Sequence, residues 1–397
     1  MLKRFATLLL LFLTYLLPFC VAGEKNSFSD IIVAERATKI CQLVGERDRQ
    51  RQEPTINRTW SRYKLRATDL GVPFRHEGRT YVLFGDTWGP PKGDAIAYTT
   101  DTTPGDGIEL TFLCDESGKY SPIRISGISQ GPFEVPVEGT SSEGRMYLYH
   151  TTDHSKKRTM RRCVVAVRRR NGTRFKYLYD LSTRYFVNVS VVEVDVNDWE
   201  GLPKRESNGL VMFGSGKYRK SNVRLAYQPT SDIASGENFF YFAGLDKSDR
   251  PVWSKEESEA RALFDQPCVG ELSVTYNRFI ARWVMLYNAS KPKRGITLRT
   301  AKKPWGPWSE AQIVFHPFED DGYGNFIHVN HKVRKVDELH DPGRADEWGG
   351  EYGPYQFPHL ATGNEGETTV YFTMSTWNPY TVVLMKAKLQ KAAKAHP

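Results

Sequence analysis

A motif of paired strands recurs along this chain, and it constrains the fold more than any other feature. Each copy has a polar turn, an aromatic strand that ends in a small or polar residue, and a second apolar strand soon afterwards. The five copies fall at residues 69–98, 146–167, 223–242, 270–299 and 370–385. Repeats made of strands alone are typical of a β-propeller, whose regular blades take about 40–50 residues. The uneven spacing predicts that some blades carry long loops.

One propeller accounts for most of the 397 residues. The hydrophobic content of 40% and the aromatic content of 13% are those of a globular protein with a large core. We expect an all-β, five-bladed β-propeller over residues 61–388. Residues 23–60 would form an N-terminal segment, in which a strand at 37–44 closes the propeller against the last blade. Residues 389–397 would be a basic C-terminal tail, with fraying from Lys386 onward.

Two segments depart from the strand pattern. Residues 255–264 follow Ser254 and are rich in Glu and Ala, which predicts a helix. Residues 319–351 are polar and rich in Gly and Asp, so we expect an extended loop over one face of the propeller. Loops of this length often line functional sites.

The first 22 residues resemble a secretory signal peptide. Lys3 and Arg4 precede the apolar stretch 8–17, and Cys20-Val21-Ala22 before Gly23 would form the cleavage site. The apolar stretch is short for a membrane span, although an uncleaved anchor is the alternative interpretation. We therefore expect a secreted, extracellular protein without stable membrane insertion.

In a secreted protein, cysteines can form disulfide bonds and some asparagines can carry glycans. Four cysteines would remain in the mature chain, and an even number in an oxidising compartment predicts two disulfide bonds, whose pairing stays open. They are Cys41, Cys114, Cys163 and Cys268. Four Asn-X-Ser/Thr sequons predict a glycoprotein. They are Asn57, Asn171, Asn188 and Asn288.

The formal net charge is +9, and much of it lies at residues 156–174. Such a region could attract an anionic polymer or surface. It could equally be a solvated hairpin edge, where charge prevents unwanted strand pairing between molecules. No motif that reads nucleic acid accompanies it, so we expect no nucleic-acid partner. We expect the protein to be a monomer.

Three carboxylates occupy related places in the repeat. Asp69 begins the innermost strand of the first copy, and Glu271 has the equivalent place in the fourth. Asp86 follows the next apolar strand of the first copy. Hydrolysis of a glycosidic bond usually needs two carboxyl groups, one as acid and one as base or nucleophile. The funnel of a propeller could bring these three together; for each one, a structural turn or strand-end role is the alternative.

Other polar and aromatic residues would bind the sugar. We expect Trp88, directly after Asp86, to stack against a sugar ring, and several more residues to bind hydroxyl groups or stack. These are Asp153, His154, Arg219, Tyr355, His359 and Trp377. For most of them, a turn or packing role explains the composition equally well.

Other hydrolytic and nucleotide chemistries have weak support. The chain has neither a Walker loop nor a His-Glu-X-X-His motif. Residues 127–131 match the serine nucleophile elbow around Ser129. That elbow must lead into a helix, whereas Pro132 and Pro136 follow directly. A plain glycine-rich turn is the better interpretation.

Six motifs, in order, resemble those of a known family. They are Thr68-Asp-Leu-Gly71, Phe84-Gly-Asp-Thr-Trp88, Phe213-Gly-Ser-Gly-Lys-Tyr-Arg219, Gly270-Glu-Leu-Ser273, Gly306-Pro-Trp-Ser309 and Ser375-Thr-Trp-Asn-Pro-Tyr380. Over about residues 37–388 the chain is similar to the domain of unknown function 4185, now glycoside hydrolase family 183. The resemblance implies a five-bladed propeller and endo-D-arabinanase activity on the α-linked D-arabinofuranose polymers of mycobacterial cell walls.

The resemblance also implies roles for individual residues. The catalytic carboxylates of the family would be Asp69 and Asp86. Analogy with other five-bladed furanosidases adds Glu271 as a third. Those enzymes often have a second-blade aspartate that modulates the acid, and here the comparable stretch offers Glu138.

We therefore expect a secreted glycoside hydrolase that cleaves a furanose-containing polysaccharide, arabinan or another furanoside. Asp69 and Asp86 would be its principal carboxylates, and Glu271 a candidate acid. We expect no cofactor and no catalytic metal, although a structural cation could sit in the central channel, where several oxygen atoms could meet. A lectin-like propeller that binds carbohydrate without catalysis is the alternative.

Overall fold

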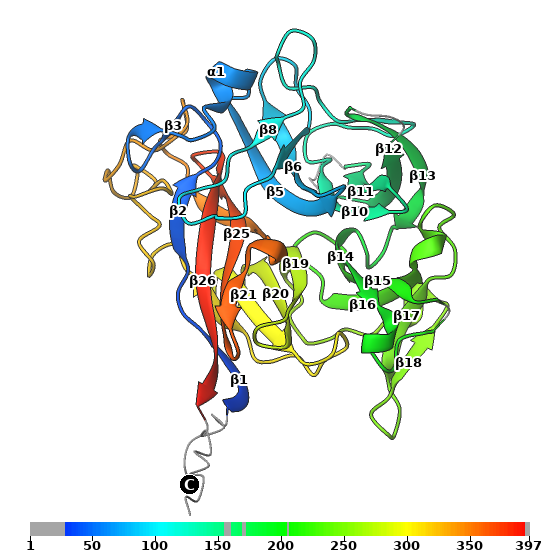
Figure 1. Ribbon diagram of the computed structural model, residues 1–397. Helices are drawn as coiled ribbons and strands as arrows, with labels where there is room; N and C mark the ends of the chain where they lie inside the picture. Colours follow the sequence, from blue (N-terminus) through cyan, green and yellow to red (C-terminus); the bar gives the residue numbers. More distant parts are fainter. Residues whose placement is uncertain (1–27, 155–159, 169–171, 205, 394–397) are drawn as a thin grey trace, which may run out of the picture.

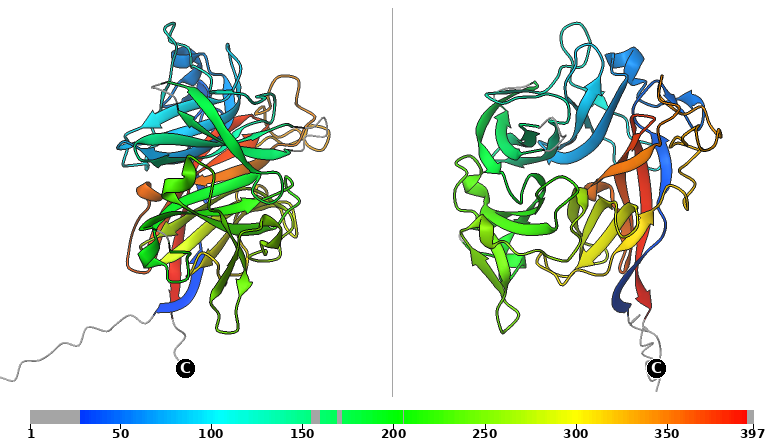
Figure 2. Two further views of the ribbon diagram at one scale, coloured as in Figure 1. Left: turned by 90° about the vertical axis from the view of Figure 1, so that its right-hand side faces the viewer. Right: turned by 180° about the vertical axis from the view of Figure 1, so that it is seen from behind.

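The computed structural model describes residues 28–154, 160–168, 172–204 and 206–393. Five small sheets stand around a central axis (Figures 1 and 2). The predicted all-β, five-bladed propeller is therefore confirmed. The predicted signal peptide lies outside the described residues. Within the described part of the chain, no helix is long and apolar enough to cross a membrane.

Each blade is one sheet. The innermost strand of each blade contacts the innermost strands of the two neighbouring blades around the axis. Blade 1 contains β5 (Ala67–His76), β6 (Arg79–Trp88), β7 (Ala95–Thr99) and β8 (Thr111–Phe112). Blade 2 contains β10 (Pro136–Ser142), β11 (Arg145–Thr152), β12 (Arg162–Arg168), β13 (Arg174–Ser182) and β9 (Arg124–Ser126). Blade 3 contains β14 (Asn188–Asp195), β15 (Asn208–Ser215), β16 (Val223–Pro229), β17 (Phe240–Leu245) and β18 (Pro251–Ser254).

Blades 4 and 5 complete the ring. Blade 4 contains β19 (Val269–Asn277), β20 (Arg282–Ala289), β21 (Gly295–Ala301) and β22 (Gln312–Phe315). Blade 5 contains β23 (Gly350–Gln356), β24 (Thr362–Asn364), β25 (Glu367–Trp377), β26 (Thr381–Ala393), β1 (Phe28–Ala34) and β2 (Thr38–Gln42). The remaining elements are short: β3 (Arg47–Asp48), β4 (Glu53–Pro54), α1 (Thr59–Tyr63), η1 (Val196–Asp198), η2 (Thr230–Ile233), η3 (Glu257–Glu259) and η4 (Pro358–Leu360).

The N-terminal segment closes the ring. β26 pairs with β25 along one edge, and along the other with β1 and β2, which come from the opposite end of the chain. Figure 1 shows these blue strands beside the red β26. The closing strand predicted at 37–44 is therefore present as β2.

Blades pack against each other through strands that are buried on both faces. β20 and β21 bury every residue along their lengths. Trp283 of β20 is fully buried, with its ring centroid 5.6 Å from that of Phe213 in blade 3. Aromatic residues in the repeated strands thus join one blade to the next, which is why the repeat is rich in them.

The prediction that the chain frays from Lys386 onward is wrong for residues 386–393. β26 continues to Ala393 and pairs with β1, and Leu389 is fully buried. The basic side chains of this stretch alternate with buried apolar ones, so the strand keeps one face in the core. Residues 394–397 lie outside the described part of the chain.

The helix predicted at 255–264 is also wrong, because this stretch contains only the three-residue turn η3. The carboxylate of Glu257 accepts hydrogen bonds from Ser182 and from the backbone of Tyr185, which fix the segment against the preceding strands. Tertiary contacts therefore override its helical propensity. The long loop is confirmed, since no strand lies in the fully described stretch between β22 and β23.

The predicted disulfide bonds are wrong. All four cysteines of the described structure are unpaired. They lie in different parts of the ring: Cys41 in β2, Cys163 in β12, Cys114 after β8 and Cys268 just before β19. Two of them, Cys41 and Cys163, are buried as thiols in the core.

Three of the four sequons cannot carry a glycan in the folded protein. Asn57, Asn188 and Asn288 are 0%, 2% and 5% exposed. The side-chain amide of Asn57 donates to the carbonyl oxygens of Leu43 and Ile108. Asn57 is therefore a structural residue, and the fourth sequon, at Asn171, lies outside the described residues.

The described part of the basic region is not a hairpin edge. β12 lies between β11 and β13 in the middle of its sheet, so the edge interpretation is wrong there. Arg162 of this strand forms ion pairs with Asp153 and Asp180. Attraction to an anionic surface stays a prediction for the rest of the region.

The strand at the C-terminus gives a stability test. We expect Leu389→Ala to lower the free energy of unfolding by about 2–5 kcal/mol, because it removes a fully buried side chain from the closing blade. Lys386→Ala, at an exposed position of the same strand, should change it by less than about 0.5 kcal/mol. Chemical denaturation measures both values. Equal, negligible effects would show that this end of the chain frays after all.

Candidate active site at the propeller axis

Side chains at the third position of the innermost strands meet near the axis. Asp69, Glu138 and Glu271 each hold this position, in β5, β10 and β19. The pairing register shifts at or beside all three, as in a β-bulge. Bulges turn a side chain away from the regular alternation of a strand and are frequent beside active sites. Here they bring carboxylates from different blades together.

A cavity of about 1510 Å³ is lined by Asp69 and Glu271. All five blades and the long loop between β22 and β23 contribute to its lining. Seven of the residues predicted for catalysis or binding line it: Asp69, Asp86, Trp88, His154, Arg219, Glu271 and Trp377. The structure therefore brings these seven residues to one cavity, and their catalytic and binding roles stay predictions.

Asp69 lies at the bottom of the cavity and is 8% exposed. Its Oδ2 accepts a hydrogen bond of 2.9 Å from the hydroxyl group of Tyr352, and Tyr380 also donates to this carboxyl group. Its Oδ1 is buried and has no hydrogen-bond partner among the described residues. Burial, followed by the charge of Asp86, raises the pKa of Asp69 well above its usual value.

Asp86 stands beside Asp69 in a strained backbone conformation, with a φ of 41°. Its backbone N–H donates to Asp94, and both of its carboxylate oxygens accept from the backbone N–H of Phe133 at 3.0 Å. Burial, followed by the charge of Asp94, raises the pKa of Asp86 to about 7. Asp94 in turn bonds to the buried His150 at 2.9 Å.

The glycine before Asp86 is required by this arrangement. A Cβ atom at Gly85 would lie 2.8 Å from Oδ1 of Asp69 and 2.7 Å from the side chain of Val135. The Phe-Gly-Asp sequence thus leaves space for the carboxyl group of the neighbouring strand. The position of the Asp69 carboxyl group therefore depends on a glycine directly before Asp86.

Two ion pairs, each between a buried carboxylate and a partly exposed arginine, also line the cavity. Glu271 accepts from the hydroxyl group of Tyr218 at 2.6 Å and from Arg219 at 3.4 Å. Glu351 accepts from Arg294 at 2.9 Å through Oε1, whereas its Oε2 has no hydrogen-bond partner among the described residues. Both carboxylates are thus held by arginine and present acidic groups to the cavity.

Two further glutamates support the site from blade 2. Glu138 is buried below the cavity, where it accepts from the backbone of Gly139 and Val191, and burial raises its pKa to about 8. Glu134 lines the cavity. Burial would raise its pKa, but hydrogen bonds, first from the backbone of Gly131 and then from Ser129, hold it below the usual value. Ser129 therefore lies in a turn and donates to a carboxylate, and no helix follows residues 127–131, as the glycine-rich turn interpretation predicts.

Aromatic side chains form one wall of the cavity. The ring centroids of Trp88 and Tyr380 are 4.9 Å apart, and those of Trp377 and Tyr380 are 5.9 Å apart. The guanidinium group of Arg344 lies 4.3 Å from the ring centroid of Trp377. Trp88 is 36% exposed, so its ring remains available to a ligand. Flat aromatic surfaces of this kind suit the apolar faces of sugars.

Three residues predicted for sugar binding lie outside the cavity lining. Asp153 is held by Arg162. Tyr355 is buried in β23, beneath the carboxylates. His359 bonds to Thr80 at 2.8 Å in η4. Their positions give no support to a direct role in binding.

Sequence reasoning missed several cavity residues. Glu351 had a recognisable signal, because Gly350-Glu351 repeats Gly270-Glu271 at the start of an innermost strand. The two tyrosines that bond to Asp69 had none, since Asp69 is far away from them in the sequence, whereas Asp94 lies only 8 positions from its partner Asp86 and was missed. Tyr352, for example, is 283 positions from Asp69.

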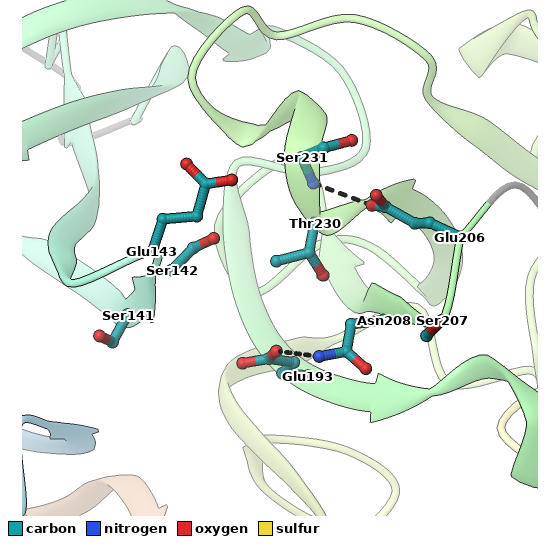
Figure 3. Close-up of a pocket in the computed structure, with 9 residues that line it drawn as sticks. All are labelled: Ser141, Ser142, Glu143, Glu193, Glu206, Ser207, Asn208, Thr230 and Ser231. Atoms are coloured by element: carbon teal, nitrogen blue, oxygen red, sulfur yellow. Dashed lines mark hydrogen bonds between the residues drawn. The ribbon is translucent and has the colours of Figure 1, made fainter.

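The axial carboxylates do not form a compact metal site. Among the described residues, one group of three metal-binding side chains has its ligand atoms within 4.8 Å of one another, and it lies in the long loop. The cation predicted for the central channel remains a prediction. A smaller hollow of about 510 Å³ lies between blades 2 and 3, lined by Glu143, Glu193, Glu206 and neutral polar residues (Figure 3). It has neither the aromatic wall nor the arginines of the axial cavity.

Comparison with solved structures identifies the same fold elsewhere. A protein from Bacteroides ovatus, classed provisionally as a hydrolase, has a TM-score of 0.53 at 11% identity, covering 82% of this chain and 86% of that one. This likeness concerns the fold alone. An exo-beta-1,3-galactanase from Phanerochaete chrysosporium has a TM-score of 0.46 at 8% identity (88% of this chain, 64% of that one). A GH43_1 enzyme from Xanthomonas citri has a TM-score of 0.44 at 12% identity (83% and 90%).

Comparison of the sequence identifies the family. No curated protein matches the chain. A family model described as a domain of unknown function (DUF4185) matches residues 55–386, which is most of the chain and the whole propeller apart from its closing strands and the end of β26. The resemblance found from the six motifs is thus confirmed, and the chain belongs to the DUF4185 family.

Proposed function

We propose that this protein is a secreted glycoside hydrolase that cleaves a furanose-containing polysaccharide, as an endo-D-arabinanase does. The observation that carries the proposal is the pair formed by Asp69 and Asp86 at the bottom of the aromatic-walled cavity. Burial raises the pKa of both groups, and the charge of Asp86 raises that of Asp69 further; neighbouring carboxyl groups with raised pKa values are characteristic of acid–base sites. The site between them and Trp88 is large enough for sugar residues of a polymer.

The environments of the two aspartates suggest different roles. Asp69 is the more deeply buried of the two, its pKa is raised well above the usual value, and its Oδ1 has no partner among the described residues, so it would hold the proton and donate it to the glycosidic oxygen. Asp86 receives backbone hydrogen bonds that favour its ionised form, so it would act as base or nucleophile at the anomeric carbon. As the glycosidic bond breaks, the departing sugar takes the proton of Asp69. The oxygen of water forms the new bond to the anomeric carbon, and the proton that this water loses returns to the pair of carboxylates.

The role that we propose for Glu271 differs from that of the candidate acid predicted from the sequence. Both of its oxygens are already bonded, to Tyr218 and Arg219. A carboxylate held in this way is better suited to binding hydroxyl groups, or to stabilising positive charge that develops on the sugar ring, than to donating a proton.

The choice of arabinan or another furanoside rests on the family resemblance and on the polar character of the cavity. The carboxylates of Glu134, Glu271 and Glu351 can accept hydrogen bonds from sugar hydroxyls. The aromatic wall can stack on ring faces. Secretion is the further part of the proposal, and it rests on the leader-like residues 1–22.

Replacement of the two aspartates tests the activity. With purified D-arabinan as substrate, we expect the mature protein to release oligosaccharides. We expect Asp69→Asn and Asp86→Asn each to lower the rate by about 10²–10⁴-fold or more, because each removes one partner of acid–base catalysis. Asp198→Asn, at an exposed position in η1, is the matched control and should keep full activity.

Two outcomes would count against this proposal. Binding of arabinan without any product from the wild type would favour the lectin-like alternative. Equal product release by wild type and both aspartate variants would place the chemistry elsewhere. Circular dichroism of the variants distinguishes a lost carboxyl group from a lost fold.

The pH dependence tests the assignment of Asp86. Because its pKa is raised to about 7 and its ionised form is the active one, kcat/KM should rise as the pH increases through about 7. Loss of activity at higher pH would then follow the deprotonation of Asp69. Asp94→Asn removes the negative charge that helps to raise this pKa, so the acidic limb should move to lower pH.

The control is again Asp198→Asn, which should leave the profile unchanged. An acidic limb near the ordinary aspartate value, at about pH 4, that Asp94→Asn does not move would contradict the assignment.

A further inference from the structure

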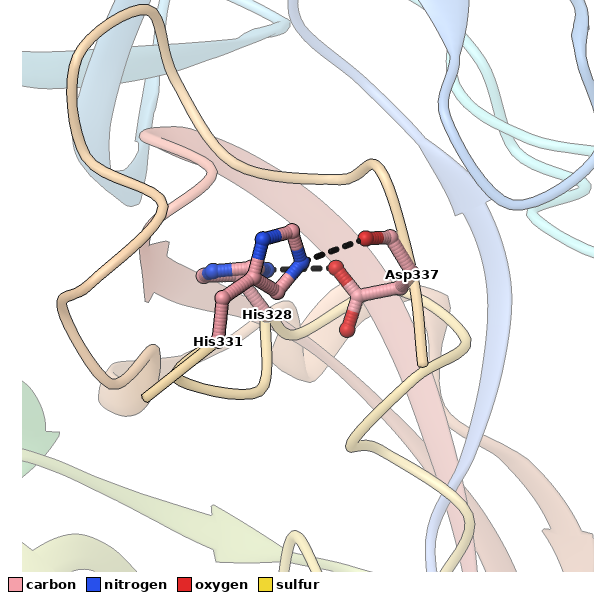
Figure 4. Close-up of side chains that lie close together, drawn as sticks. All are labelled: His328, His331 and Asp337. Carbon is pink, nitrogen blue, oxygen red and sulfur yellow. Dashed lines mark hydrogen bonds and ion pairs between the residues drawn. The ribbon is translucent and has the colours of Figure 1, made fainter. Parts of the chain in front are cut away.

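The long loop carries a cluster of histidines, with the one group of potential metal ligands found among the described residues. His328, His331 and Asp337 come from consecutive turns of the loop and point toward one another (Figure 4). One ligand atom from each residue lies within 4.8 Å of the others. The ring of His340 packs against both histidines, with centroids 5.0 and 5.3 Å away. His328 is fully buried.

The hydrogen-bond partners of His328 call for a positive charge beside its ring. Its Nε2 lies 2.8 Å from the carbonyl oxygen of Ala345, which can only accept, so Nε2 carries a proton. Its Nδ1 faces the carboxylate of Asp337, which in its ionised form also only accepts. A neutral imidazole would present a lone pair to that carboxylate. The position between the two groups therefore calls for a positive charge, either a second proton on the ring or a metal ion.

The surrounding bonds orient these groups as ligands are oriented in metal sites. Histidine ligands typically donate their second ring N–H to a backbone carbonyl or a carboxylate, which fixes the tautomer. His328 does so toward Ala345, and one ring nitrogen of His331 lies 2.8 Å from the carbonyl oxygen of Asp337. The carboxylate of Asp337 is held by the backbone N–H groups of Val329 and Leu339.

We propose that His328, His331 and Asp337 form a zinc site. Ligand atoms around a tetrahedral zinc ion lie roughly 3.3 Å apart, given Zn–N distances of about 2.0–2.1 Å. The three atoms, within 4.8 Å of one another, therefore need only small movements. Two imidazoles and one carboxylate suit Zn²⁺, whereas Ca²⁺ prefers six to eight oxygen ligands. Water completes the coordination.

The site would be structural, and it would fix one wall of the axial cavity. The backbone of His328 pairs with Gly349, and that of His331 donates to Ala345. The adjoining residues Arg344, Glu347, Trp348 and Gly349 line the cavity. A metal ion that links distant positions of a long loop stabilises the folded protein, because it restricts the conformational freedom of the loop.

Zinc loading of the tag-free mature protein tests the proposal. After incubation with zinc sulfate and dialysis, we expect one zinc per chain by elemental analysis, and a rise in Tm with zinc but not with calcium or magnesium. His331→Ala should weaken zinc binding by about 100-fold or more, since loss of even an orienting residue weakens metal affinity by about 10–100-fold. His316→Ala, a half-buried histidine of the same loop outside the cluster, should bind zinc as the wild type does.

Cobalt gives a second readout that does not depend on stability. Cobalt(II) in place of zinc should show the strong visible absorption of a tetrahedral site in the wild type and in His316→Ala, and lose it in His331→Ala. Failure of the folded wild type to retain zinc would overturn the proposal, and so would equal zinc affinity in His331→Ala and wild type. Neither measurement uses hydrolysis, so its outcome is independent of the proposed activity.

Discussion

The structure depends on the closure of its ring by strands from both ends of the chain. β1 and β2 complete the blade that β26 ends, so the five innermost strands are held in a circle and cannot separate singly. That circle determines where a side chain at the third position of each innermost strand must point. Asp69, Glu138 and Glu271 are separated by many residues in the sequence, yet closure places them around one axis.

Convergence of carboxyl groups in a buried place is costly unless their charge is reduced or compensated. The protein uses both solutions in one cavity. Glu271 and Glu351 are compensated by Arg219 and Arg294. Asp69 and Asp86 form no ion pair with an arginine or lysine of the described segments, and their raised pKa values mean that the pair retains a proton where isolated aspartates would have lost it. Glu271 and Glu351 are therefore suited to binding, whereas Asp69 and Asp86 can transfer a proton.

Much of the fold could be predicted because the repeat encodes it locally, in aromatic strands and polar turns. The predictions that failed depended on partners distant in the sequence. Residues 255–264 have helical composition, but Glu257 bonds to the preceding strands. The cysteines have the even number of a disulfide-bonded protein, but they lie in separate blades. Asp69 and Glu271 could be predicted from their place in the repeat, whereas Tyr352 and Tyr380 could not, because only ring closure brings them to Asp69.

The central claim is that the pair of Asp69 and Asp86 retains a proton near neutral pH, where isolated aspartates are fully ionised. Carbon-13 NMR of the protein labelled at the aspartate carboxyl carbons, recorded across a pH titration, tests it most directly. We predict one carboxyl signal that titrates near pH 7, is absent from Asp86→Asn, and is shifted in Asp69→Asn, because the two sites are coupled. If every aspartate of the folded wild type titrates below about pH 5, the pair is simply two ionised carboxylates, and the account of the site is wrong.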